Sequence, residues 1–190
     1  MFIVFVCKKA IGEFDLLLVL RICLFVVLRK FRVIPSHEAM KRLVLRASVQ
    51  YAKEPYMKDL LLRLLAYENI GVLRIIDRYR KKGYYVVLST AAPAAYADLI
   101  AKHFCFDYVC ATSMAVEQSD WHENVKEEKM RATVHLLDKI DARLAIFLTD
   151  HDDDLPLLRI PKDANIIVNP TSKTLEKLEQ ERIVYRLLPK

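Results

Sequence analysis

The sequence has 190 residues, of which 54% are hydrophobic and 28% are charged. This balance allows a sizeable core, and it excludes a disordered chain or a polar repeat array. The formal net charge is +6, with +10 over residues 1–90 and −4 over residues 91–190. Solvated helix faces explain this split most simply, and a basic lobe that attracts an anion toward an acidic, metal-holding lobe is the alternative. The lysines and arginines are not interleaved with aromatic residues, so we do not expect nucleic acid as a partner.

The cysteines and one apolar run indicate where in the cell the protein is expected. The four cysteines show no metal-binding spacing and are expected to be free thiols in a reducing cytoplasm. The run LLLVLRICLFVVL at residues 16–28 is too short to span a membrane and contains Arg21. No small-residue cleavage site follows it, as a signal peptide requires. We therefore expect a cytoplasmic protein with no membrane span, in which this helix is buried on most sides of a helical bundle.

Residues 1–80 are expected to form a helical cap. Apolar residues recur at helical spacing over residues 14–34, and again near residues 40–44 and 60–65. Ser36 is expected to cap one helix, and KEP at residues 53–55 to start another. Gly83 follows RYRKK, which is typical of a helix end.

Residues 81–190 are expected to form an α/β core. Short apolar runs at 84–89, 106–112, 144–150 and 164–170 alternate with helical segments near 90–104, with Pro93 in the first turn, and 125–139. This alternation predicts a doubly wound, Rossmann-like parallel sheet covered by helices on both faces. Functional residues of such sheets lie at the carboxyl ends of the strands, where we expect Ser89 and Asp150.

Three polar clusters at these places predict a phosphate site assisted by magnesium. Ser89 and Thr90 precede a helix whose free backbone N–H groups favour an anion. Lys129 lies near the start of another helix, and TDHDDDLP places Asp150 after a strand and Asp154 four residues later. A hydroxyl and a lysine bind phosphoryl oxygens, and carboxylates are ligands for Mg²⁺.

Each cluster taken singly also has a plainer interpretation. Ser89 is then a strand-end capping residue and Lys129 a solvated helix lysine. The carboxylates are then favoured by the positive end of a helix, and Asp152 and Asp153 are expected to cap it or to face solvent. His151 is expected to be a loop side chain rather than a ligand or a base.

The order of these motifs resembles the haloacid dehalogenase superfamily, in its phosphoserine-phosphatase-like branch. VVLSTAAPAAYADLIAKHFCFDYVCATSM is similar to the second motif of that branch and the segment after it, ENVKEEKMRATVHL to its third, and TDHDDDLPLL to its fourth. The resemblance covers roughly residues 1–170, with the helical stretch as the cap. It implies a Mg²⁺-dependent hydrolase that acts on a small phosphorylated molecule.

The resemblance also implies roles for individual residues. Ser89, Lys129 and Asp150 correspond to catalytic positions. Phosphate is bound by Ser89, Thr90 and Lys129, with Thr90 offering its backbone N–H. The metal ligands are Asp150 and Asp154.

The first motif of the family, D-x-D-x-T at the end of a strand, is not found. No D-x-D occurs before residue 150, so the carboxylate that attacks phosphorus is missing. Without it no covalent route is open, and we expect a weak or inactive hydrolase. The alternative is a non-catalytic protein on the same fold that binds an anion or a protein partner.

Two explanations account for the missing motif. In the first, which we favour, the residues from Phe2 onward are the cap helices that follow the motif in relatives, and the sequence starts too late. In the second, MFIVFV is itself the first strand and Cys7 occupies the catalytic loop. That strand lies centrally in the family's sheet, so its loss predicts that the flanking strands close up or that the amino-terminal residues fill the gap.

Overall fold

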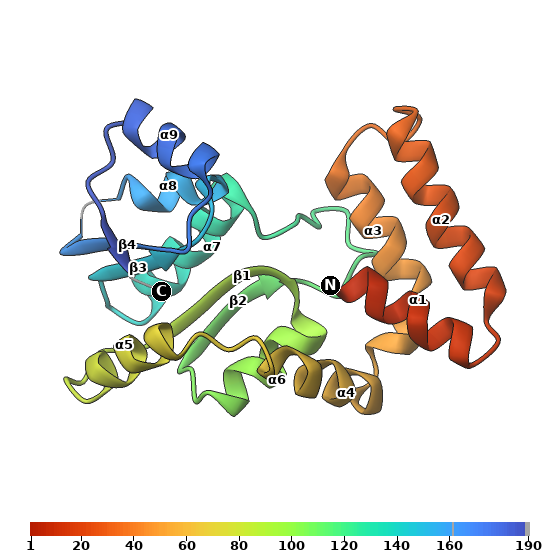
Figure 1. The fold of residues 1–190 in the computed structure, drawn as a ribbon, viewed down its shortest axis with the longest axis horizontal. Coiled ribbons are helices and arrows are strands. Elements are labelled where there is room, and N and C mark those ends of the chain that lie inside the picture. The colour runs from red at the N-terminus through yellow and green to blue at the C-terminus, as the bar shows by residue number, and fades with distance from the viewer. Residues whose placement is uncertain (161, 189–190) are drawn as a thin grey trace. The chain divides into compact units, whose positions relative to one another are not determined.

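The computed structural model of the protein describes residues 1–160 and 162–188. Helices and parallel β-sheet make an α/β fold, as the sequence predicts (Figure 1). The helices are α1 (Phe2–Gly12), α2 (Leu16–Lys30), α3 (His37–Ala47), α4 (Glu54–Leu65), α5 (Ile70–Arg80), α6 (Ala94–His103), α7 (Lys126–Lys139), α8 (Leu155–Leu158) and α9 (Ser172–Gln180), with 3₁₀ turns η1 (Val49–Ala52) and η2 (Asp152–Asp154). The strands are β1 (Val87–Pro93), β2 (Tyr108–Thr112), β3 (Ile146–Thr149), β4 (Ala164–Val168) and β5 (Arg186–Leu188). None of the described helices is both long and apolar enough to cross a membrane.

The chain forms two compact units, each assembled from several segments. The first unit contains residues 1–68, 92–104 and 112–123, and the second contains residues 69–91, 105–111 and the chain from residue 124 onward. This division differs from a single cut after residue 80, because α5 belongs to the second unit and α6 to the first. The polypeptide therefore passes between the units several times.

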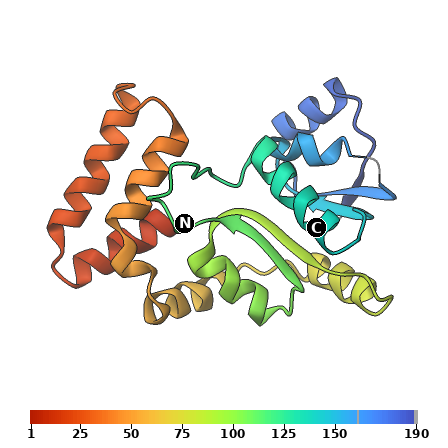
Figure 2. The same cartoon turned by 180° about the vertical axis from the view of Figure 1, so that it is seen from behind.

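The first unit is a group of helices that start at clear capping signals. The side chain of Ser36 accepts a hydrogen bond from the backbone N–H of Ala39 at 3.0 Å, which confirms the predicted cap of α3. Pro55 stands in the first turn of α4, as KEP predicts. Helix α2 packs against α1 and α3, and α2 and α3 lie side by side in both views (Figures 1 and 2). Helix α4 packs against α6.

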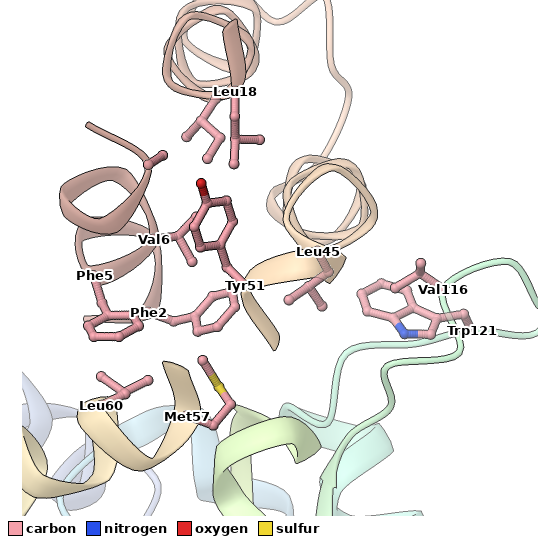
Figure 3. Close-up of a cluster of buried hydrophobic side chains, with 12 residues drawn as sticks. Phe2, Phe5, Val6, Leu18, Leu45, Tyr51, Met57, Leu60, Val116 and Trp121 are labelled. Carbon is pink, nitrogen blue, oxygen red and sulfur yellow. The ribbon is translucent and has the colours of Figure 1, made fainter. Parts of the chain in front are cut away.

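The core of this unit surrounds Tyr51, which is 1% exposed (Figure 3). Its ring lies between Val6 of α1, Leu18 of α2 and Leu45 of α3. The buried members of the cluster are Phe2, Phe5, Val6, Ala10, Leu18, Ile22, Leu45, Tyr51, Met57, Leu60, Val116 and Trp121. The last two come from the segment at residues 112–123, so that segment is part of the core of the first unit.

The prediction that the helix at residues 16–28 is buried on most sides is wrong. Helix α2 buries Leu18 and Ile22, whereas Leu17 and Leu20 are 69% and 66% exposed. Its contacts are with α1 and α3, which cover one face only. The hydrophobic composition of α2 indicated burial. The number of helices that pack against α2 limits how much of its surface is buried.

The amino-terminal residues form a helix, so the alternative in which MFIVFV is a strand is wrong. In α1 the buried residues Phe2, Phe5, Val6 and Ala10 recur at helical spacing. Cys7 lies in the middle of this helix and not in a loop.

The second unit contains a three-stranded parallel sheet in the order β3-β4-β5. Leu148 pairs with Ile166, and Val168 pairs with Leu188. The buried side chains of this unit's cluster are Phe147, Leu155, Leu157, Leu158, Ile167 and Leu178. The sequence did not indicate α9 and β5, which extend the unit beyond the last predicted strand.

Strand β1 starts later than predicted and pairs with β2 in a separate sheet. The reason lies at the end of α5, where Gly83 has φ +80° and Tyr84 donates its N–H to Tyr79 O at 3.2 Å. This Schellman-type ending confirms Gly83 as a helix terminator and occupies the residues before Val87. Ser89 is consequently the third residue of a strand that runs to Pro93, and not its last. Helix α6 begins at Ala94, beyond Ser89 and Thr90.

Neither expected consequence of a missing central strand is found in the described part of the chain. Strands β1 and β3 do not pair with each other. The amino-terminal residues form α1 in the other unit and add no strand to either sheet. The second unit therefore has two sheets where one was predicted.

Candidate functional site

Helix α7 carries a buried lysine that is paired with a buried carboxylate. Lys129 and Asp154 are 9% and 6% exposed, and Lys129 Nζ donates to Asp154 Oδ1 at 2.5 Å. Burying either charge alone would cost several kcal/mol, and the pairing offsets much of that cost. Two of the predicted site residues, from segments 25 residues apart, are thereby brought into direct contact.

The second oxygen of Asp154 is also held. Thr149, the last residue of β3, donates its hydroxyl to Asp154 Oδ2 at 2.6 Å. Thr149 is buried, and Asp154 lies at the end of η2. Because each carboxylate oxygen accepts a hydrogen bond, Asp154 orients Lys129 relative to the end of β3.

The rest of the acidic loop is more open to solvent. Asp150 directly follows β3, as predicted, and its side chain is exposed. His151 Nδ1 accepts a hydrogen bond from the backbone N–H of Asp153 at 3.0 Å and so caps η2, in agreement with its expected loop role. Lys126 Nζ lies 3.7 Å from Asp153, on the exposed surface.

Ser89 contacts the same helix one turn further along. Ser89 Oγ and Thr133 Oγ1 lie 2.9 Å apart, and Thr133 is buried four residues after Lys129. Helix α7 thus contacts β1 through Thr133 and the loop after β3 through Lys129. Its first two turns bring Ser89 and Asp154 to one region of the second unit.

Thr90 is positioned by a residue that the sequence did not indicate. The side-chain amide of Asn124 donates to Thr90 O at 2.9 Å and to Cys110 O at 2.8 Å. Asn124 is buried, so these bonds form away from solvent. It joins β1 and β2 just ahead of α7. Asn124 stands directly before the predicted helix in ENVKEEK, and this position was the signal available in the sequence. Its hydrogen-bond partners Thr90 and Cys110 are distant in the sequence, so they could not be predicted.

Two threonines were also missed, Thr133 and Thr149. Thr133 lies four residues after Lys129, on the same face of α7, and this spacing was the signal that could have indicated it. Thr149 precedes Asp150 in the motif itself. Threonine is common in strands and on half-buried helix faces, so neither residue type singled out a site.

A Mg²⁺ ion at this place would need oxygen ligands from the acidic loop. The described residues contain no group of three or more His, Cys, Asp or Glu side chains able to hold a metal ion. Asp150 offers one exposed carboxylate, whereas both oxygens of Asp154 accept hydrogen bonds. Mg²⁺ commonly takes one or two protein carboxylates together with waters and substrate oxygens. The described residues therefore offer Asp150 as one exposed carboxylate, without a cluster of further ligands around it.

Residues 5–159 match the haloacid dehalogenase-like hydrolase family. The chain belongs to this family. The match includes α7, β3 and the acidic loop, so the paired Lys129 and Asp154 lie within the family region.

Solved structures of other proteins share the fold of this haloacid dehalogenase-like protein. A protein of unknown function from Bordetella pertussis Tohama I is 16% identical with a TM-score of 0.66, over 81% of this chain and 74% of that one. A probable phosphoserine phosphatase from Vibrio cholerae is 13% identical with a TM-score of 0.64, over 92% of this chain. The alignment spans 53% of the Vibrio chain, about half its length. A search of curated proteins found no significant match.

Proposed function

We propose that this protein binds phosphate monoesters at Ser89, Thr90 and Lys129, and that residues 1–190 hydrolyse them weakly or not at all. The observation that carries the proposal is the buried pairing of Lys129 with Asp154, held in turn by Thr149. A lysine that is buried at this cost and held against the loop after a parallel strand is suited to hold an anion. The small phosphorylated substrate agrees with the Vibrio neighbour, a probable phosphoserine phosphatase.

The donors suit a phosphoryl group. Lys129 has three N–H donors and gives one to Asp154, which leaves two for phosphoryl oxygens. The Ser89 hydroxyl can accept from Thr133 while it donates to phosphate, because a hydroxyl does both. Thr90 would offer its backbone N–H, and Asn124 holds the carbonyl of the same residue.

Asp150 would be the carboxylate ligand of Mg²⁺, with Asp154 behind it. A bound Mg²⁺ neutralises charge on phosphoryl oxygens. Asp154 would act mainly by positioning Lys129, because its two oxygens already accept hydrogen bonds. Asp150 is exposed and free to reach an ion from solvent.

Catalysis would be weak because residues 1–190 contain no D-x-D-x-T motif. No carboxylate of this chain is then assigned to attack phosphorus, and covalent catalysis has no nucleophile. A non-catalytic protein that binds an anion or a protein partner is the second candidate, and the same absence favours it. A cytoplasmic location is part of the proposal, because all four cysteines are free thiols.

Phosphate titration followed by NMR tests the anion site. Lys129→Gln removes the charge and keeps an N–H donor for Asp154, so the fold should be retained. We expect phosphate affinity to fall about tenfold or more, since hydrogen bonds to charged groups contribute roughly 1.5–3 kcal/mol. Lys126→Gln is the matched control on the same helix, and its exposed side chain should change affinity less than about twofold. Equal effects of the two substitutions would contradict the site.

A further inference from the structure

Helix α2 carries a stripe of apolar side chains on the side that faces solvent. Their exposed fractions run from 46% at Val27 to 73% at Phe31. The opposite side of α2 buries Leu18 and Ile22 against α1 and α3, and α2 lies at the edge of its unit in both views (Figures 1 and 2). The members of this α2 stripe are Leu17, Leu20, Leu24, Val27 and Phe31.

The α2 stripe has the spacing of a coiled-coil seam. Its residues follow one another in steps of three, four, three and four, so all of them lie on one side of the helix. This repeat averages 3.5 residues and lets the side chains of one helix insert between those of another. A helix that packs on one side only normally has a polar opposite face. The seam on α2 therefore indicates a second helical partner.

The exposed apolar area is larger than a monomer usually leaves open. Phe14 and Val33 lie beyond the two ends of the stripe in sequence and are 88% and 67% exposed. Phe14 and Phe31 alone present roughly 300 Å², because an aromatic side chain has about 150–250 Å² to bury. The largest apolar patch of a typical monomer is about 300–600 Å², and the aliphatic residues of the stripe add to the two rings. The patch is therefore of the order that one partner gives to a standard interface, about 800 Å².

The two ends of α2 carry opposite charge. Glu13 and Asp15 lie at its start, whereas Arg29, Lys30 and Arg32 lie at its end. Two antiparallel copies of α2 place the acidic end of each beside the basic end of the other, and their helix dipoles also attract. Parallel copies would place three cations of one chain beside three of the other. The charges therefore select an antiparallel pair.

We propose that the α2 stripe binds the same stripe of a second copy of this chain, in an antiparallel dimer with two-fold symmetry. Leu24 is the middle residue of the stripe, so it lies at the two-fold axis and contacts its own copy. Leu17 lies opposite Phe31 of the partner subunit, and Leu20 opposite Val27 of the partner subunit. Helix α2 is already held by α1 and α3, so little freedom is lost on association. The inference does not depend on the proposed phosphate site, because the residues of that site belong to the second unit.

A membrane surface is a different occupant for an apolar helix face. Helices that lie on membranes combine one apolar face with a polar face rich in lysine and arginine. The other face of α2 is apolar and buried in its own unit, and one end of the helix is acidic. These features favour a protein partner, and the seam spacing favours a second copy of α2.

Sedimentation equilibrium of the full chain tests the dimer. We expect dimers at protein concentrations below ~100 µM. Leu24→Glu should raise the dimer dissociation constant at least about a hundredfold, because two carboxylates would face each other in an apolar seam. Leu62→Glu on α4 is the matched control, since Leu62 is 69% exposed and lies outside the stripe, and it should leave the dimer unchanged. Leu24 is 51% exposed, so circular dichroism should show that both variants are folded.

Cys23 reports the orientation of the two helices. It is exposed and adjoins Leu24, so it lies near the two-fold axis of an antiparallel dimer. An antiparallel seam puts the two copies of Cys23 on the same side, whereas a parallel seam puts them on opposite sides. A short bismaleimide should therefore join the two chains of the wild-type dimer. Cys105→Ser removes another exposed thiol and should still be joined, whereas Cys23→Ser should not.

Four results would overturn the proposal. A monomer at every concentration up to ~100 µM would remove the dimer. A dimer that Leu24→Glu does not weaken would place the interface elsewhere. A dimer that is not joined through Cys23 would contradict the antiparallel arrangement. Cosedimentation of a monomer with phosphatidylserine and phosphatidylcholine vesicles, lost in Leu24→Glu, would make a membrane the occupant of the stripe.

Discussion

Lys129 Nζ of α7 and Asp154 Oδ1 of η2 lie 2.5 Å apart, and both side chains are buried. The pair joins the start of a helix to the loop after β3, which are the two segments that resemble the third and fourth family motifs. Thr149 donates to the same carboxylate, so that three residues hold one another.

Lys129→Met should lower the free energy of unfolding by ~3 kcal/mol, because Asp154 would remain buried without a cation. Urea denaturation followed by circular dichroism measures the change. The double variant Lys129→Met/Asp154→Leu should recover most of the loss, since neither charge is then buried. Lys126→Met is the control, and its exposed side chain should cost less than about 0.5 kcal/mol. A double variant less stable than the single one would contradict the account.

Thr149→Val should destabilise the protein by about 1–2 kcal/mol in the same urea experiment, because Asp154 Oδ2 loses a buried donor. Valine keeps the shape of threonine, so the loss reports the hydrogen bond rather than packing. Thr149→Ser retains the hydroxyl and should keep Asp154 satisfied. If serine and valine were equally costly, packing of the methyl group and not the hydroxyl would matter.

The 190-residue chain should show negligible phosphatase activity on an aryl phosphate in the presence of Mg²⁺. The physical reason is the absence of an attacking carboxylate in D-x-D-x-T. Release of the coloured phenol is the measurement. Turnover that requires Mg²⁺ and disappears in Asp150→Ala would show that a nucleophile is present after all.

Mg²⁺ should bind weakly, and Asp150→Asn should abolish the binding. A site with so few ligands competes poorly with the water that hydrates this ion. Saturation therefore requires high concentrations of Mg²⁺. Asp152→Asn is the matched control from the same loop and should leave the titration nearly unchanged. Mn²⁺ or Mg²⁺ is titrated into the three proteins at one ionic strength, because general screening would otherwise imitate a site. Equal losses would indicate only a diffuse acidic patch.

Tyr51 should make the protein less stable in alkali. Burial, together with the charges of Glu13 and Asp15, raises the pKa of Tyr51 to about 12. The unfolded chain deprotonates this phenol near its ordinary pKa of about 10. The stabilisation is therefore complete below pH ~10 and is lost as pH rises toward the folded-state pKa.

The check is the unfolding free energy of wild type and Tyr51→Phe between neutral pH and the alkaline limit. The difference between the two proteins should change with pH only above ~10. Tyr67→Phe is the control, because Tyr67 is 76% exposed. Parallel pH profiles for wild type and Tyr51→Phe would show that this phenol is not the titrating group.

Local features of the fold were predictable from the sequence. Ser36, Pro55 and Gly83 mark helix boundaries through contacts with residues at most a few positions away, so the sequence contains the whole interaction. The alternation of strands and helices identified an α/β protein, and the order of motifs identified its family. The sequence indicated Lys129, Asp150 and Asp154 as candidate site residues, because each lies at a functional position of a segment that resembles a family motif.

Long-range relations required the tertiary structure. The contact of Lys129 with Asp154, and of Ser89 with Thr133, depends on how α7 packs against two different strands. The exposure of α2 depends on how many helices pack against it, and hydrophobic composition does not contain that number. The separation of β1 and β3 into two sheets was likewise hidden, because a strand's sequence indicates that it can pair but not which strand lies beside it.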